Sequence, residues 1–176
     1  MSLPTWSRRL PVALAAAGTA WPALAADLTL KLELPRLDVA EYHRPYVAIW
    51  LERPDQSFAG NLAVWYDIKL RNQGGTKWLK DLRSWWRQSG RELTLPLDGL
   101  STATRAPGEH SLTFAGTRAP LAGLPDGDYQ LVVEAARETG GRERVKVPFQ
   151  WPPKAAATAQ ARGREELGGI SLQLKP

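Results

Sequence analysis

Hydroxyl side chains are concentrated in one short stretch of the chain, Asp98-Gly99-Leu100-Ser101-Thr102-Ala103-Thr104, which Arg105 follows. A hydroxyl that a second enzyme modifies must lie in an exposed loop of small residues, because it has to enter that enzyme's active site. Arg105 could offset the charge of an attached phosphodiester, while Asp98 could accept hydrogen bonds from loop amides or orient the acceptor. The stretch is therefore a candidate site of covalent modification, at Thr104 or else at Ser101 or Thr102.

The stretch resembles the acceptor motif of exported proteins that carry covalent flavin mononucleotide (FMN). In that motif an Asp is followed by Ser/Thr-Gly/Ala-Ala-Ser/Thr, and the final hydroxyl is esterified. The resemblance implies that Thr104 holds the FMN. Thr102 departs from the motif, which most often has Gly there, and its side chain could hinder entry into the transferase. The alternative is an ordinary Asp-Gly turn followed by a polar loop, which is common in all-β proteins.

A second concentration of functional side chains lies between Thr76 and Ser89. Trp and Leu recur there at helical spacing on one face and Lys and Arg on the other, with Thr76 as a possible N-cap. The pattern predicts a short helix that caps one end of a β-sandwich, with its indoles in the core. A compatible interpretation is that an indole such as Trp85 or Trp86 stacks on a flavin ring or a partner.

Composition disfavours several other functions. The chain has no cysteine, so disulfides, thiolate metal sites and iron–sulfur clusters are excluded. His43 and His110 lie far apart without a ligand pattern such as H-x-x-x-H, so no metal is expected. Asp98, Ser101 and His110 include the residue types of a hydrolase triad, but no G-x-S-x-G nucleophile elbow is present. A carrier or a binding domain is therefore expected rather than an enzyme.

The first 26 residues have the pattern of an export signal. Arg8 and Arg9 form the positive region, Leu10 to Leu24 forms the apolar region, and an A-x-A site predicts cleavage near Ala25 or Ala26. Removing the two arginines from the 23 basic residues leaves 21 against 18 acidic ones, a net charge of about +3. This charge is too small and too scattered to favour a nucleic-acid partner.

Apolar alternation at period two dominates the remaining chain, and it predicts an all-β, immunoglobulin-like sandwich of about seven strands. Residues 27–153 are expected to form the sandwich domain. Residues 154–176 are expected to add a mobile connector, rich in Ala, Gln, Arg and Gly, and a terminal strand of the same domain. The expected strands are Leu28–Leu34, Tyr46–Leu51, Leu62–Leu70, His110–Phe114, Tyr129–Ala136, Val145–Trp151 and Gly169–Leu174.

Landmarks along the whole chain are similar to those of the predicted periplasmic domain-of-unknown-function family 2271. They are Tyr46 to Trp50, Trp78 to Trp86, Pro107 to His110 and Gly127 to Glu138. The resemblance implies a sandwich found beside PepSY-type membrane proteins and flavin transferases, in systems that move electrons outside the cytoplasm.

Three functions remain open on these grounds. The first is a periplasmic electron carrier with FMN on Thr104, for which a flavin transferase and a PepSY-type membrane redox protein are the expected partners. The second is a cofactor-free module that docks on a membrane or exported partner. The third is a carbohydrate-binding module that uses exposed indoles among the six tryptophans beyond residue 26.

Overall fold

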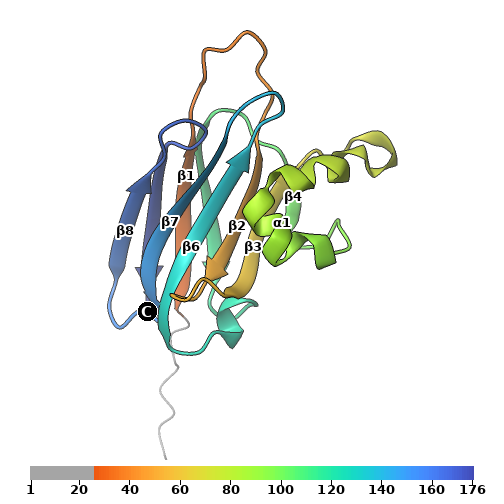
Figure 1. Cartoon of the computed structure of the whole chain (residues 1–176). Helices are drawn as coiled ribbons and strands as arrows, with labels where there is room; N and C mark the ends of the chain where they lie inside the picture. The colour runs from red at the N-terminus through yellow and green to blue at the C-terminus, as the bar shows by residue number, and fades with distance from the viewer. Residues whose placement is uncertain (1–25) are drawn as a thin grey trace, which may run out of the picture.

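The computed structural model describes residues 26–176, which fold into two β-sheets packed face to face (Figure 1). The expected signal peptide lies outside the described residues, apart from Ala26. One sheet has the strand order β5-β1-β9-β8 and the other the order β4-β3-β2-β6-β7. The strands are β1 (Asp27–Leu34), β2 (Tyr46–Glu52), β3 (Phe58–Tyr66), β4 (Ser101–Ala103), β5 (Gly108–Ala115), β6 (Gly127–Ala136), β7 (Arg142–Trp151), β8 (Ala157–Arg162) and β9 (Gly169–Lys175).

The main core lies between the two sheets. Along β1 the side chains at even positions are buried and those at odd positions are half-buried, as period-two alternation predicts. The four leucines of β1, from Leu28 to Leu34, are at most 1% exposed, and burying each contributes about 1.5–3 kcal/mol. The fold confirms the predicted sandwich, with nine strands in place of about seven. At the start of β6 the Tyr129 hydroxyl donates to the Pro125 carbonyl at 2.8 Å, as in the tyrosine corner of immunoglobulin-like domains.

Strand β8 lies in the segment that the composition predicted to be a mobile connector. It pairs antiparallel with β9, from Ala157↔Leu174 to Arg162↔Gly169. The prediction missed this strand because its Ala-Thr-Ala-Gln-Ala-Arg sequence lacks the large apolar residues that mark most strands. As an edge strand with mostly exposed side chains, it is held by backbone pairing more than by burial.

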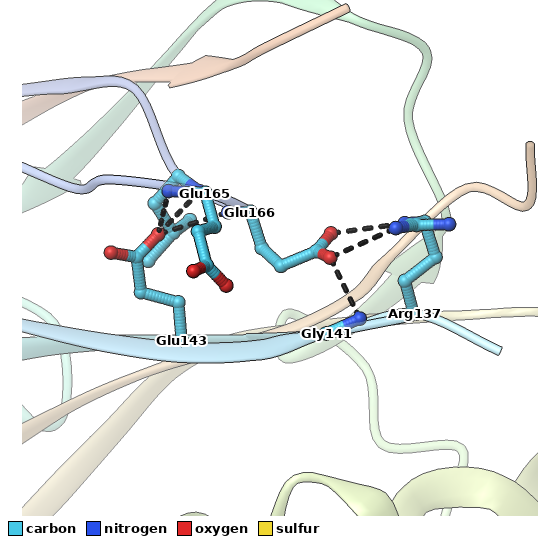
Figure 2. A network of polar contacts seen from close by, with 6 residues as sticks. Arg137, Gly141, Glu143, Glu165 and Glu166 are labelled. Atoms are coloured by element: carbon cyan, nitrogen blue, oxygen red, sulfur yellow. Dashed lines mark hydrogen bonds and ion pairs between the residues drawn. The ribbon is translucent and has the colours of Figure 1, made fainter. Parts of the chain in front are cut away.

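Polar contacts tie the β8–β9 loop to the β6–β7 hairpin (Figure 2). The Glu143 carboxylate accepts backbone N–H groups from four consecutive residues, Arg164 to Leu167, at 2.6–3.1 Å. The Glu166 carboxylate in turn accepts two hydrogen bonds from the Arg137 guanidinium, at 3.0 and 3.1 Å, and one from the Gly141 amide at 2.8 Å. Burial pushes the pKa of Glu143 up, but the four N–H donors outweigh it, so the pKa lies below its ordinary value.

Short helices form a third layer on the outer face of the five-stranded sheet (Figure 1). They are η1 (Arg71–Asp81), α1 (Arg83–Gln88) and η2 (Gly90–Glu92), while η3 (Leu121–Gly123) lies elsewhere in the chain. The prediction that one helix caps an end of the sandwich was wrong, because Leu79, Leu82 and Trp85 pack on Trp50 and other outward-facing side chains of this sheet.

The predicted helix from Thr76 to Ser89 is also broken in two. The break is at Leu82, between η1 and α1, whose φ of −74° and ψ of 68° are not helical. The Thr76 hydroxyl donates to the Gln73 carbonyl at 2.7 Å instead of capping a helix. The preceding strand, predicted to reach Leu70, ends at Tyr66 because the Ile68 amide turns back to the Tyr66 carbonyl at 2.8 Å. Among residues 26–176, no helix is long and apolar enough to cross a membrane.

Candidate functional site

Thr104 leaves the five-stranded sheet at the point where two strands end together. Strand β4 pairs in parallel with β3, with Val64 opposite Ser101 and Tyr66 opposite Ala103. Thr104 therefore emerges next to Asp67, which follows β3. Because β2 is antiparallel to β3, the start of β2 at Tyr46 lies at the same end of the sheet.

The turn before β4 uses the side chain of Ser101. The Ser101 hydroxyl accepts the Leu97 amide at 3.1 Å, and the amides of Leu100 and Ser101 both donate to the Leu97 carbonyl. Gly99 has a φ of 75°, a conformation that glycine adopts without steric cost. The Asp98-Gly99 turn is thus confirmed, but Ser101 to Ala103 form strand β4 rather than the polar loop expected in that interpretation, and Thr104 lies outside the turn.

A pocket of about 230 Å³ opens beside Thr104. Its apolar wall includes the side chains of Tyr46, Leu70 and Trp78, and Trp78 is 46% exposed. Burial raises the pKa of the Tyr46 phenol above its ordinary value, so Tyr46 is neutral at physiological pH. The full lining is His43, Arg44, Tyr46, Asp67, Leu70, Trp78, Asp81, Thr104, Ala136 and Glu138.

The charged part of the pocket wall is mainly acidic. Asp67, Asp81 and Glu138 face one arginine, Arg44, and His43. The His43 ring lies 3.7 Å from the Glu138 carboxylate and 3.0 Å from Glu41, which is outside the lining. These carboxylates make the pocket a better environment for a neutral aromatic ring than for an anion.

Arg105 points its guanidinium at a different aromatic ring. Its Cζ atom lies 4.2 Å from the centroid of the Trp65 ring, a cation–π contact, and Trp65 in turn meets the His110 ring edge to face at 5.7 Å. Partial burial lowers the pKa of Arg105 from its ordinary value, but an arginine remains charged in proteins. Arg105 is thus held next to Thr104 in the chain and is not among the residues that line the pocket.

The other predicted site residues lie away from this pocket. Asp98 lines a separate hollow with Gly99, Leu100 and Arg118, at the opposite end of β4. Trp85 is fully buried, and its indole N–H donates to Asn61 Oδ1 at 2.8 Å. Trp86 lines a third hollow with Thr76, Leu79 and Leu93. The structure therefore brings none of these three beside Thr104.

Sequence reasoning did not identify Trp78 as the tryptophan that lines the pocket beside Thr104. Its helical spacing to Trp85 suggested that both side chains share one buried face. The break in the helical layer separates them, so Trp85 packs in the core while Trp78 reaches the pocket. The position of Tyr46 at the start of β2 could have marked it as a residue at one end of the sheet. Only the pairing of β2 with β3 and of β3 with β4 shows that this end is the one where Thr104 lies.

Two buried carboxylates hold the helical layer that carries Trp78. Glu134 accepts the Ser84 and Trp85 amides at 2.9–3.1 Å and the Arg142 guanidinium at 2.7 Å. These amides belong to the first turn of α1, where unpaired N–H groups favour a negative charge. The Glu52 carboxylate similarly accepts hydrogen bonds from the Trp50 indole N–H and from the side-chain amide of Gln88. It also pairs with Lys146 at 2.6 Å.

Two alternative site types find little support in the described residues. In residues 26–176, no group of three or more His, Asp or Glu side chains is arranged to hold a metal ion. Of the six tryptophans in the same range, only Trp78 is among the exposed large hydrophobic residues. A platform of several exposed indoles, as a carbohydrate-binding module would use, is therefore not formed by this part of the chain.

Comparison with known proteins identifies a family. The family model described as "Predicted periplasmic protein (DUF2271)" matches residues 27–169, from the start of β1 to the start of β9. None of the curated proteins or solved structures compared shows significant similarity to the chain. The matched range includes strands β1 to β8, the helical layer and Thr104. The chain therefore belongs to the DUF2271 family of predicted periplasmic proteins.

Proposed function

We propose that this protein is a periplasmic electron carrier with FMN joined through its phosphate to Thr104. The observation that carries the proposal is the position of Thr104. The residue that matches the esterified position of the acceptor motif lies on a pocket whose wall includes a half-exposed indole and a partly buried phenol. Bound FMN would supply one- and two-electron transfer, with the protein providing orientation and electrostatics.

Attachment requires that Thr104 reach the active site of a flavin transferase. The Thr104 Oγ atom would attack the phosphorus of the FMN half of FAD. A new P–O bond forms as the bond to AMP breaks, and the hydroxyl proton passes to a base on the transferase. No electrons are exchanged in this step. Access is favoured because Thr102 and Ala103 are exposed on an edge strand of only three residues, and residues 104–106 have no regular structure.

The pocket suits the isoalloxazine ring better than the phosphate. Trp78 and Tyr46 offer aromatic surfaces for stacking, a contact worth about 0.5–1.5 kcal/mol beyond the buried area. The volume of about 230 Å³ is below the usual range for a ligand pocket, roughly 300–1,000 Å³. The ring would therefore be partly covered and would keep an edge open for a redox partner. The phosphodiester, joined to the Thr104 hydroxyl oxygen, would lie at the edge of the pocket, where Thr104 is part of the lining.

The partners belong to the same proposal. A flavin transferase is required for attachment, and a PepSY-type membrane redox protein, which the family resemblance implies, is the electron donor or acceptor that we propose. The cofactor-free docking module is the alternative function. It is favoured by the exposed apolar side chains next to the pocket, and it predicts that the protein stays colourless beside an active transferase.

Flavin fluorescence on a denaturing gel tests the attachment site, with the protein co-expressed with an active flavin transferase. Wild type and Thr104→Ser should fluoresce, and Thr104→Ala should not. Ser101→Ala and Thr102→Ala are matched controls that each remove one neighbouring hydroxyl, and both should keep the label. A fluorescent Thr104→Ala band, or the loss of the label in only one of the controls, would assign the acceptor elsewhere.

The place of the ring is tested separately in the labelled, native protein. Trp78→Ala should leave the amount of attached flavin unchanged and raise its emission, because a stacked indole quenches flavin fluorescence. Trp86→Ala is the control, since this indole lines a different hollow. Equal emission from wild type and both variants would show that the ring lies outside the pocket.

A further inference from the structure

One surface segment presents apolar side chains to solvent rather than to the core. The segment from Asp67 to Lys80, called here the projecting segment, extends away from the sandwich (Figure 1). Three of the five large hydrophobic residues that the described structure exposes belong to it: Ile68 at 39%, Leu70 at 46% and Trp78 at 46%. The other two, Val39 and Leu97, lie elsewhere in the chain. Exposed apolar groups collected in this way mark an interaction site.

The exposure is a consequence of the fold of the segment, since its neighbouring residues are firmly packed. Leu79 is 1% exposed and anchors the segment in the outer core, so Trp78, the residue before it, faces outward. A Cβ atom added at Gly75 would clash with the Asp67 carbonyl oxygen, so the two ends of the loop are in close contact. The loop between them is thereby held in a shape that presents Ile68 and Leu70.

Basic side chains neighbour these apolar ones along the segment, while the carboxylates of Asp67, Asp81 and Glu138 line the pocket together with Leu70 and Trp78. Lys69, Arg71, Lys77 and Lys80 are all exposed, and Asp67 is the one acidic residue of the segment. Four basic residues against one acidic residue give the segment a charge of +3. The segment thus carries a net positive charge where its apolar residues are exposed.

We infer that the projecting segment docks on an anionic lipid surface. Trp at the level of the headgroups, aliphatic side chains below and Lys or Arg around them are the pattern of interfacial membrane binding. Each basic residue near an anionic surface strengthens binding about fivefold. A projection inserts into an interface, whereas a peptide or protein tail needs a groove. Because Leu70 and Trp78 also line the pocket beside Thr104, docking places that pocket next to the membrane.

Binding to lipid vesicles tests this inference with the flavin-free protein, so its outcome is independent of the flavin proposal. Co-sedimentation with vesicles of phosphatidylglycerol and phosphatidylethanolamine should exceed that with phosphatidylcholine vesicles, and 0.5 M salt should weaken it. The double variant Lys77→Glu/Lys80→Glu should lower partitioning at least about tenfold. Trp78→Ala should lower it several-fold.

A matched charge control makes the test specific. Arg118→Glu/Lys154→Glu changes the net charge by the same amount at exposed positions far along the chain from the segment, and it should lower partitioning much less than the Lys77/Lys80 variant. Circular dichroism melts confirm that every variant is folded. Absence of vesicle binding, equal binding to both vesicle types, or equal losses in the two double variants would overturn the inference. Binding to an acidic protein without binding to vesicles would overturn it as well.

Discussion

Replacement of Glu134 by alanine removes the carboxylate that fixes the helical layer on the sheet. This carboxylate is 0% exposed. It accepts the Ser84 and Trp85 amides and pairs with Arg142 at 2.7 Å. A hydrogen bond to a charged group contributes about 1.5–3 kcal/mol, and two such bonds come from buried amides, whereas Arg142 is 39% exposed and can be hydrated when its partner is removed. We therefore expect Glu134→Ala to lower the free energy of unfolding by about 3–5 kcal/mol.

The magnitude is large against the total stability of a domain, about 5–15 kcal/mol. Urea denaturation followed by circular dichroism measures it, with an unchanged m value as the sign that the two-state comparison is valid. Glu109→Ala is the matched control. The Lys31–Glu109 pair spans 3.8 Å, and its side chains are 44% and 67% exposed, so its removal should cost less than about 1 kcal/mol. Equal losses in the two variants would refute the capping role of Glu134.

Three further predictions concern other parts of the fold. Because the pKa of Glu143 is lowered in the folded protein, its contribution to stability is present above the ordinary Glu pKa and is lost as the pH falls through the lower folded value. The stability difference between wild type and Glu143→Gln, from urea melts at several pH values, should therefore shrink on acidification; a difference that grows would contradict this. Gly75→Ala should destabilise the protein by about 1–3 kcal/mol, because its Cβ would meet the Asp67 carbonyl; an unchanged melting temperature would contradict the close contact. Trp85→Ala should lower the free energy of unfolding by about 3–5 kcal/mol, and Trp78→Ala by less than about 1 kcal/mol. Similar losses for the two variants in urea denaturation would contradict the assignment of Trp85 as buried and Trp78 as exposed.

Strands with one buried face could be predicted from the sequence, and those without one could not. The leucines of β1 alternate strictly, so both the strand and its inward face follow from the sequence alone. Strands β4 and β8 are three and six residues long, lie at sheet edges and have few buried side chains. Backbone hydrogen bonds to a neighbouring strand define them, and these bonds leave no hydrophobic pattern.

The sequence singles out Thr104 as the proposed acceptor, but it does not indicate which residues surround it. A local motif singles out Thr104, whereas its neighbours depend on the parallel pairing of β4 with β3, in which Val64 lies opposite Ser101, 37 positions further along the chain. The helical spacing of Trp78 and Trp85 also misled the assignment. The break at Leu82, between η1 and α1, gives the two indoles different environments, which composition and spacing do not encode.

Intact mass spectrometry of the exported protein, made with and without an active flavin transferase, tests the central claim most directly. The proposal predicts a mass increase of one FMN, roughly 440 Da after loss of water, that requires the transferase and disappears in Thr104→Ala. An unmodified mass beside a transferase that labels another acceptor protein in the same cells would contradict the proposal. In that case the chain from Asp98 to Thr104 is an ordinary turn and edge strand, and the docking module becomes the better-supported function.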